Sequence, residues 1–66
     1  MTIDNTKRAN VGLGTKVEVV QKQDQRSGKL TSGVVKRILT NSPNHPHGIK
    51  VMLESGIVGR VKNILL

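Results

Sequence analysis

A strict alternation of apolar residues in the segment GIKVMLE, residues 48–54, constrains the fold most. Ile49, Val51 and Leu53 recur at every second position, and charged residues stand at positions 50 and 54. A period of two places alternate side chains on opposite faces of a strand. The segment therefore predicts a β-strand that buries one face.

The segment TKVEVVQK, residues 15–22, predicts an earlier strand. It is rich in β-branched residues, and Val17 and Val19 alternate with charged residues. Such alternation favours a half-buried strand. The polar segment 23–29, with a glycine near its end, predicts the connection that leads from this strand to the next.

Residues 31–40, TSGVVKRILT, predict another strand. Gly33 lies inside it, and a glycine within a strand indicates a bulge or a tight bend of the kind that small barrels need. A helix over residues 33–39 is the alternative. We disfavour the helix, because its β-branched pair directly follows the glycine.

The segment ESGIVGRV, residues 54–61, predicts a hairpin with a two-residue turn at positions 55 and 56, where a glycine supplies the positive φ. In that register Val51 faces Arg60, which would put an arginine on the apolar face. A bulge at Gly59 would turn Arg60 outward, so we expect one there. The apolar residues 64–66 either close the sheet as a short last strand or meet a partner chain.

These segments together predict an all-β domain, a small SH3-like (KOW-like) partly open barrel of four to five antiparallel strands. An OB-fold ranks second, because it usually needs a longer chain. We expect residues 1–11 to form a flexible N-terminal tail and residues 12–66 a single domain. With 66 residues, no aromatic residue and no cysteine, the core must be thin, and self-association as a homodimer is one remaining route to stability.

The net charge indicates the class of partner. Eleven lysines and arginines oppose four acidic residues, a formal charge of +7, which favours polyanions such as RNA. No apolar run reaches the ~20 residues of a membrane span, and the N-terminal residues lack the apolar core of a secretory signal. We therefore expect a cytoplasmic protein with no membrane partner.

From Gly12 onward the chain resembles the YwbE family of small uncharacterised bacterial and archaeal proteins. The resemblance is carried by KQDQRSGKLTSGVVKRILTNSPNHPHGIKVMLESGIVGRV, which spans most of the expected domain. It implies a compact β-domain that occurs as a separate chain. It brings no catalytic residues that could be transferred to positions here.

A weaker resemblance links the chain to KOW-type modules of ribosomal proteins and transcription elongation factors. These have a strand, a basic loop and then a glycine followed by alternating apolar residues. Residues 15–22 correspond to the first strand and residues 33–38 to the glycine and the second strand. The resemblance implies an SH3-like barrel and, by analogy of fold, a role in RNA binding.

The segment TNSPNHPHGIKV, residues 40–51, contains two prolines and two histidines. We interpret it mainly as a loop stiffened by its prolines, with His45 and His47 as candidates for contacting a base or a phosphate. A metal site at these histidines would need a third ligand, Asp24 or Glu54, from elsewhere in the fold. We therefore predict no metal and no cofactor.

Seven cations are the candidate nucleic-acid-binding residues. Two project from the polar loop and five lie on the predicted strands: Arg26, Lys29, Lys36, Arg37, Lys50, Arg60 and Lys62. The loop lacks the GxxxxGK[ST] spacing of a nucleotide-binding P-loop. Because the chain has no Phe, Tyr or Trp to provide the usual stacking platform, we expect recognition of the nucleic-acid backbone or shape.

We predict a non-enzymatic module that binds RNA or a ribonucleoprotein surface through backbone electrostatics. The acidic residues lie far apart in the sequence, and no nucleophile motif accompanies the histidines, so no catalytic residues are assigned. The alternative is a protein-interaction module or homodimer that uses exposed Met52, Ile57 and the apolar C-terminus.

Overall fold

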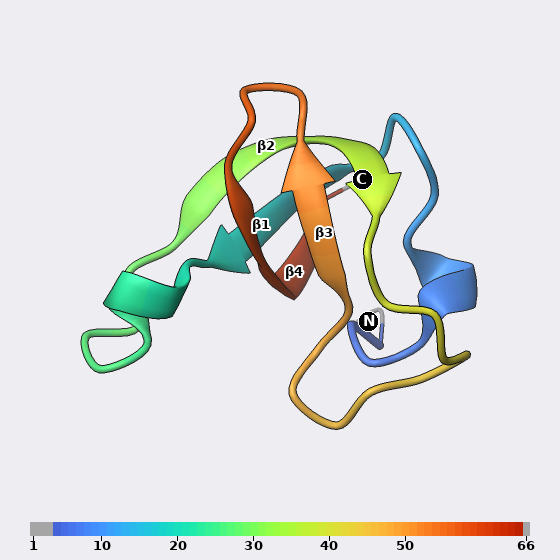
Figure 1. Ribbon diagram of the computed structural model, residues 1–66, viewed down its shortest axis with the longest axis horizontal. Helices are drawn as coiled ribbons and strands as arrows, with labels where there is room; N and C mark the ends of the chain where they lie inside the picture. Colours follow the sequence, from blue (N-terminus) through green and yellow to red (C-terminus); the bar gives the residue numbers. More distant parts are fainter. Residues whose placement is uncertain (1–3, 66) are drawn as a thin grey trace.

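The computed structural model describes residues 4–65, which form a closed four-stranded barrel (Figure 1). Its strands are β1 (Lys16–Val20), β2 (Thr31–Ile38), β3 (Lys50–Leu53) and β4 (Val58–Leu65). All neighbouring strands are antiparallel, and β4 pairs with both β3 and β1. The predicted all-β barrel is confirmed, and it is closed where the sequence predicted a partly open one.

The core consists of aliphatic side chains from every strand. The alternation that predicted the strands is confirmed, because Val17, Val19, Ile49, Val51 and Leu53 are all fully buried. Burying one such side chain contributes roughly 1.5 to 3 kcal/mol. Three more buried residues complete the cluster: Val11, Val35 and Val61.

Gly33 acts through packing and not through a bulge. It pairs in regular register with Val17 on β1, and a Cβ at this position would lie 2.7 Å from Leu53 Cδ1. The missing side chain therefore admits Leu53 to the core. The irregularity of β2 lies between Val35 and Arg37, in its pairing with β3. A bulge at Gly33 is therefore wrong, and the tight bend expected as its alternative stays a prediction.

The β3–β4 hairpin has a three-residue turn instead of the predicted two-residue turn. Leu53 N–H donates to Ile57 O (2.8 Å), Gly56 N–H donates to Leu53 O (2.8 Å), and Gly56 has a φ of +90°. The extra turn residue shifts the register by one, so that Val51 lies opposite Gly59. The turn itself therefore resolves the conflict at Arg60, and the predicted bulge at Gly59 is wrong.

The end of β4 closes the barrel. Ile64 and Leu65 pair with Val17 and Lys16 of β1, so these residues extend β4 and do not form a separate fifth strand. The β1–β4 register shifts between Glu18 and Val19. Leu66, which was expected to share this role, lies outside the described residues.

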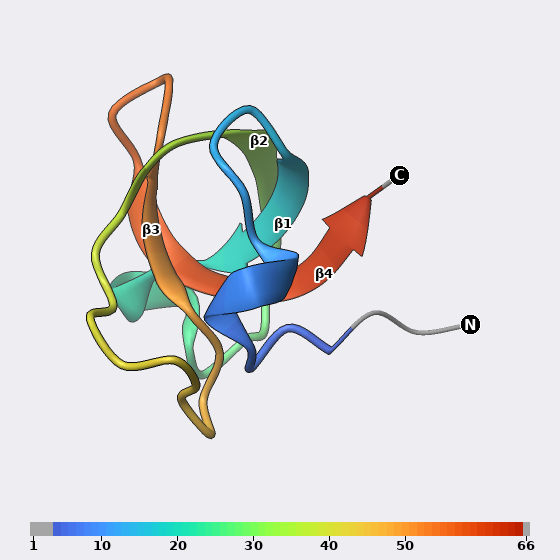
Figure 2. The same cartoon turned by 90° about the vertical axis from the view of Figure 1, so that its right-hand side faces the viewer.

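The described part of the expected N-terminal tail is bound to the barrel. Its main chain pairs with the segment after β2: Arg8 N–H donates to Pro43 O, and His45 N–H donates to Thr6 O, both at 2.8 Å. Val11 is 1% exposed and belongs to the core. Figure 2, viewed nearly along the barrel, shows this segment in front of one end. Residues 4–11 thus lie against the barrel, the flexibility expected for 1–11 stays a prediction, and positions 1–3 lie outside the described residues.

Helical structure within residues 4–65 consists of the two 3-10 helices η1 (Arg8–Asn10) and η2 (Lys22–Asp24). Neither resembles a segment that could cross a bilayer, and no helix in this part of the chain is long and apolar enough to do so.

Candidate functional site

The outer face of β3 and β4 carries a cluster of cations. Lys50 and Arg60 are directly opposite each other in the β3–β4 ladder, and Lys62 follows on β4. Lys50 and Lys62 are exposed, whereas Arg60 is half-buried. Cross-strand partners on one face lie roughly 4.5 to 5.5 Å apart at Cβ, so the sheet brings these charges together.

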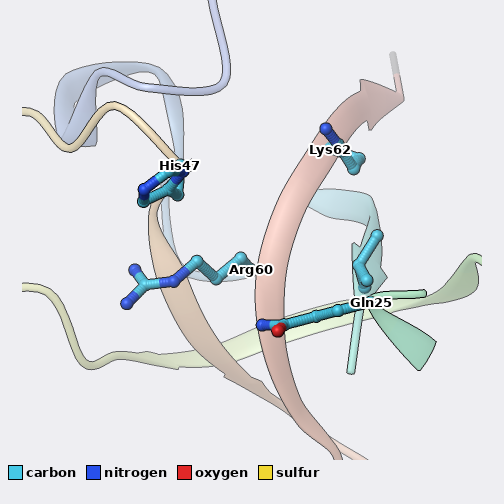
Figure 3. Close-up of a pocket in the computed structure, with 5 residues that line it drawn as sticks. Gln25, His47, Arg60 and Lys62 are labelled. Carbon is cyan, nitrogen blue, oxygen red and sulfur yellow. The ribbon is translucent and has the colours of Figure 1, made fainter. Parts of the chain in front are cut away.

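Two adjoining hollows lie beside Arg60, with volumes of about 420 and 440 Å³. Both are lined by Val20, Gln25 and Arg60. The first is completed by His47 and Lys62 (Figure 3), and the second by Lys22, Gln23, Lys50, Val58 and Gly59. We call the two hollows together the basic groove. Its residues come from β1, β3, β4 and the two loops 21–30 and 39–49.

Arg60 is held in place at the centre of the basic groove. Its Nη1 donates a hydrogen bond to Gly48 O (3.1 Å). Gly48 is buried with a φ of +100°, and a Cβ there would overlap the Val61 carbonyl oxygen. This close approach brings the end of loop 39–49 against β4. The guanidinium, which has five N–H donors, therefore has a fixed position and further donors for a ligand.

Loop 21–30 forms the other side of the basic groove. Within it, η2 is followed by a turn in which Gly28 N–H donates to Asp24 O (2.8 Å). The end of β1 lies beneath this loop. Val20 alternates with the inward-facing Val19 and pairs with outward-facing Arg60, yet it is only 8% exposed. Val20 thus provides an apolar floor on the outer surface of the barrel.

The two histidines occupy different positions relative to the basic groove. Their ring centroids are 5.7 Å apart, and His47 N–H donates to His45 Nδ1 (3.2 Å). His47 lines the first hollow. Partial burial, followed by the positive charge of Arg60 and by His47, lowers the pKa of His45 below its usual 6.5. Within residues 4–65 no group of three or more His, Cys, Asp or Glu side chains converges to hold a metal ion.

The remaining predicted cations lie outside the hollows. Lys36 and Arg37 are exposed on β2, and Arg26 and Lys29 are exposed in loop 21–30. Arg37 pairs with Met52, which lies two residues after Lys50 on β3. The seven-residue set therefore divides into three residues that line the basic groove and four that do not.

Six lining residues were not predicted from the sequence as site residues: Val20, Lys22, Gln23, Gln25, Val58 and Gly59. Lys22 was assigned to the end of the first strand, and Gln25 was treated as part of a solvated turn. Val20 was missed because its burial depends on the path of loop 21–30. The signal in the sequence was the Val19-Val20 pair, since the second valine of such a pair must face away from the core.

Acidic residues do not line either hollow. Glu18 accepts a hydrogen bond from Asn63 Nδ2 (3.0 Å) on the outer face of β1 and β4. The Thr6 hydroxyl and backbone N–H donate to Asp4, and these bonds lower the pKa of its carboxyl group. Glu54 lies exposed in the β3–β4 turn. The basic groove thus combines cations and amides without a neighbouring counter-charge in its lining.

Comparison with known proteins identifies the family. The profile of a family described as "Uncharacterized conserved protein (DUF2196)" matches residues 4–64. The "Uncharacterized protein YwbE" of Bacillus subtilis (strain 168) is 49% identical over 63 residues, which cover 96% of this chain and 97% of that protein. The chain belongs to the YwbE (DUF2196) family. No solved structure matches it. The match to the family profile spans β1 to β3, β4 up to Ile64 and every residue of the basic groove.

Proposed function

We propose that this YwbE-family chain is a small non-enzymatic module that binds RNA, free or in a ribonucleoprotein, and acts in the cytoplasm. The observation that carries the proposal is the basic groove, in which Lys22, Lys50, Arg60 and Lys62 converge without an acidic lining residue. A concave surface of one charge sign attracts polyanions and raises their rate of association.

Binding is expected to depend on contacts with phosphates. A cation that meets a phosphate releases a counterion, so affinity falls with salt at a slope of roughly −0.7 per contact for a single strand. The weaker likeness to KOW-type modules supports RNA as the polyanion. The family comparison supplies no ligand, so the proposal depends on the groove and the charge.

The test compares two double variants by fluorescence anisotropy with labelled RNA at ~50 and ~200 mM salt. Lys50→Gln/Lys62→Gln removes two exposed charges from the basic groove, and Lys36→Gln/Arg37→Gln removes two from β2. Both variants lower the net charge equally. We expect the groove variant to lose clearly more affinity and to flatten the salt slope by about 1.4, as for two lost phosphate contacts.

Equal losses in the two variants would show that general attraction to the whole surface explains binding, and would contradict the groove as the site. Unchanged affinity in both would contradict binding through these charges, and no binding of the unmodified chain would contradict RNA binding itself. Circular dichroism of each variant checks that the barrel is intact.

Docking of a protein or a second copy through Met52, Ile57 and the C-terminus has less support. Ile57 and Ile64 pack against the core, and Met52 is half-buried. The exposed leucines lie on separate connections, at positions 13, 30 and 39. Apolar residues scattered singly over a surface are usual for a monomer.

A further inference from the structure

The basic groove contains apolar surface as well as charge. Val20 is 8% exposed, although it lies on the outer face and outside the core cluster. Val58, which is half-buried, lines the second hollow together with Val20. Phosphates gain nothing from an apolar floor, whereas the face of a nucleobase can pack against one. The groove therefore suits a ligand with charged and flat apolar parts.

Arg60 supplies the flat surface that the composition otherwise lacks. The chain has no Phe, Tyr or Trp, and in RNA recognition an arginine guanidinium can replace an aromatic ring as a stacking partner for a base. The bond from Nη1 to Gly48 O orients the Arg60 guanidinium. The side chain borders both hollows, and Figure 3 shows it in the first. A base can stack on this guanidinium only when it is not already stacked within a duplex.

Gln25 adds a group that can distinguish between bases. It is exposed, it lines both hollows, and Figure 3 shows its carboxamide directed toward β4. A carboxamide carries two N–H donors and an acceptor, and unpaired bases are recognised by hydrogen bonds to their edges. Each hollow that Gln25 lines also contains a lysine, Lys62 in the first and Lys22 with Lys50 in the second.

We propose that the basic groove binds single-stranded RNA in preference to duplex RNA, with an unpaired base stacked on the Arg60 guanidinium and its edge bonded to the Gln25 carboxamide. The backbone phosphates on either side of this base meet the lysines of the two hollows. This inference rests on the proposed function and specifies its ligand. A duplex presents phosphates to the groove but keeps its base faces inside the helix, so it gains the charge contacts alone.

The test measures the anisotropy of a labelled single-stranded oligoriboadenylate and of an RNA duplex of equal length at ~100 mM salt. We expect the single strand to bind about tenfold more tightly, in line with one stacked base. Arg60→Lys keeps the charge and removes the plane, so it should abolish most of this preference while the salt slope stays unchanged. Arg37→Lys is the matched exchange outside the groove and should change neither quantity.

A second variant, Gln25→Ala, tests the groove without disturbing the hydrogen bond from Arg60 to Gly48. Gln25→Ala alters an exposed side chain, so the fold should be unaffected, and we expect affinity for the oligoriboadenylate to fall several-fold with little change for the duplex. Duplex binding as tight as single-strand binding, or unchanged behaviour in both Arg60→Lys and Gln25→Ala, would overturn the inference while leaving RNA binding in place. Failure of both RNAs to bind would instead refute the proposed function.

Discussion

The two loops that border the basic groove are held in opposite ways. Loop 21–30 is organised mainly by local bonds, such as that from Gly28 N–H to Asp24 O, and one bond from Gln21 Nε2 to Thr31 Oγ1 (3.2 Å). Loop 39–49 is tied to segments far away in the sequence. The N-terminal residues bond to one side of it, and Arg60 bonds to Gly48.

This difference indicates which side of the groove is fixed. Long-range bonds to packed segments break only when larger parts of the structure open, whereas a loop with local bonds opens at low cost. Loop 39–49 therefore holds Arg60 and His47 in fixed positions, and loop 21–30, which carries Lys22 and Gln25, can adjust to a ligand. A fixed Arg60 guanidinium beside a Gln25 carboxamide that can change its position suits an RNA ligand whose base sequence varies.

The largest expected difference between the loops concerns their left-handed glycines. Gly48→Ala combines an unfavourable φ of +100° with overlap of the new Cβ and the Val61 carbonyl oxygen. We expect the free energy of unfolding to fall by roughly 3 kcal/mol or more. Gly28→Ala has a φ of +72° but no atom within 4 Å of its Cβ, so it should cost only about 1 kcal/mol.

Urea denaturation of the two variants measures both values. The pair is matched, because each places the same methyl group on a left-handed residue of a loop that contributes to the groove. Similar losses in both would mean that loop 39–49 is no more tightly packed than loop 21–30, and the comparison between the two loops would be wrong.

The sequence predicted the barrel better than its connections. Alternation alone identified the inward residues of β1 and β3, because burial on one face imposes a period of two. The hairpin between β3 and β4 was placed correctly, but its length was not. Gly56 satisfies a positive φ in turns of two or three residues alike, so local residue types could not decide the register.

The site was predictable to the extent that it lies on strands. Lys50 and Lys62 were candidates because they lie on predicted strands, where the pleat sets the direction of each side chain. The outward direction of Arg60 was expected only from a bulge at Gly59, and the structure achieves it through the three-residue turn instead. The binding of residues 4–11 to loop 39–49 was not predictable, since main-chain bonds such as His45 N–H to Thr6 O depend on no particular side chain. Burial of Val20 likewise depends on the path of a polar loop.

A smaller effect is expected from the side-chain bond that joins the N-terminal segment to β4. Asn5 Nδ2 donates to Val61 O (2.7 Å) in a half-buried position. Asn5→Ala should lower the free energy of unfolding by about 1 to 2 kcal/mol, because it removes this bond. Ser27→Ala removes exposed local bonds of loop 21–30 and should change stability by less than about 0.5 kcal/mol. If the two variants lose equal stability in urea denaturation, the bond from the N-terminal segment to β4 stabilises the fold no more than the exposed local bonds of loop 21–30 do.

The smallest expected difference between the loops is their response to pH, because loop 39–49 carries both histidines of the chain and loop 21–30 carries none. In the folded state the pKa of His45 lies below 6.5, first through partial burial and then through Arg60 and His47. The unfolded chain therefore binds this proton more tightly than the folded chain. The stabilising contribution of neutral His45 is complete above the unfolded pKa and is lost as the pH falls toward the folded pKa.

Thermal denaturation from pH 8 to pH 5 should show a small decrease in Tm for the unmodified chain and a shallower decrease for His45→Gln. Protonation at Nδ1 would also remove the acceptor for His47 N–H, so the decrease should be accompanied by faster amide exchange at His47. Amide exchange at Gly28, in loop 21–30, provides the internal reference after correction for the intrinsic pH dependence. If Tm falls with pH equally in His45→Gln and in the unmodified chain, protonation of His45 does not account for the loss of stability.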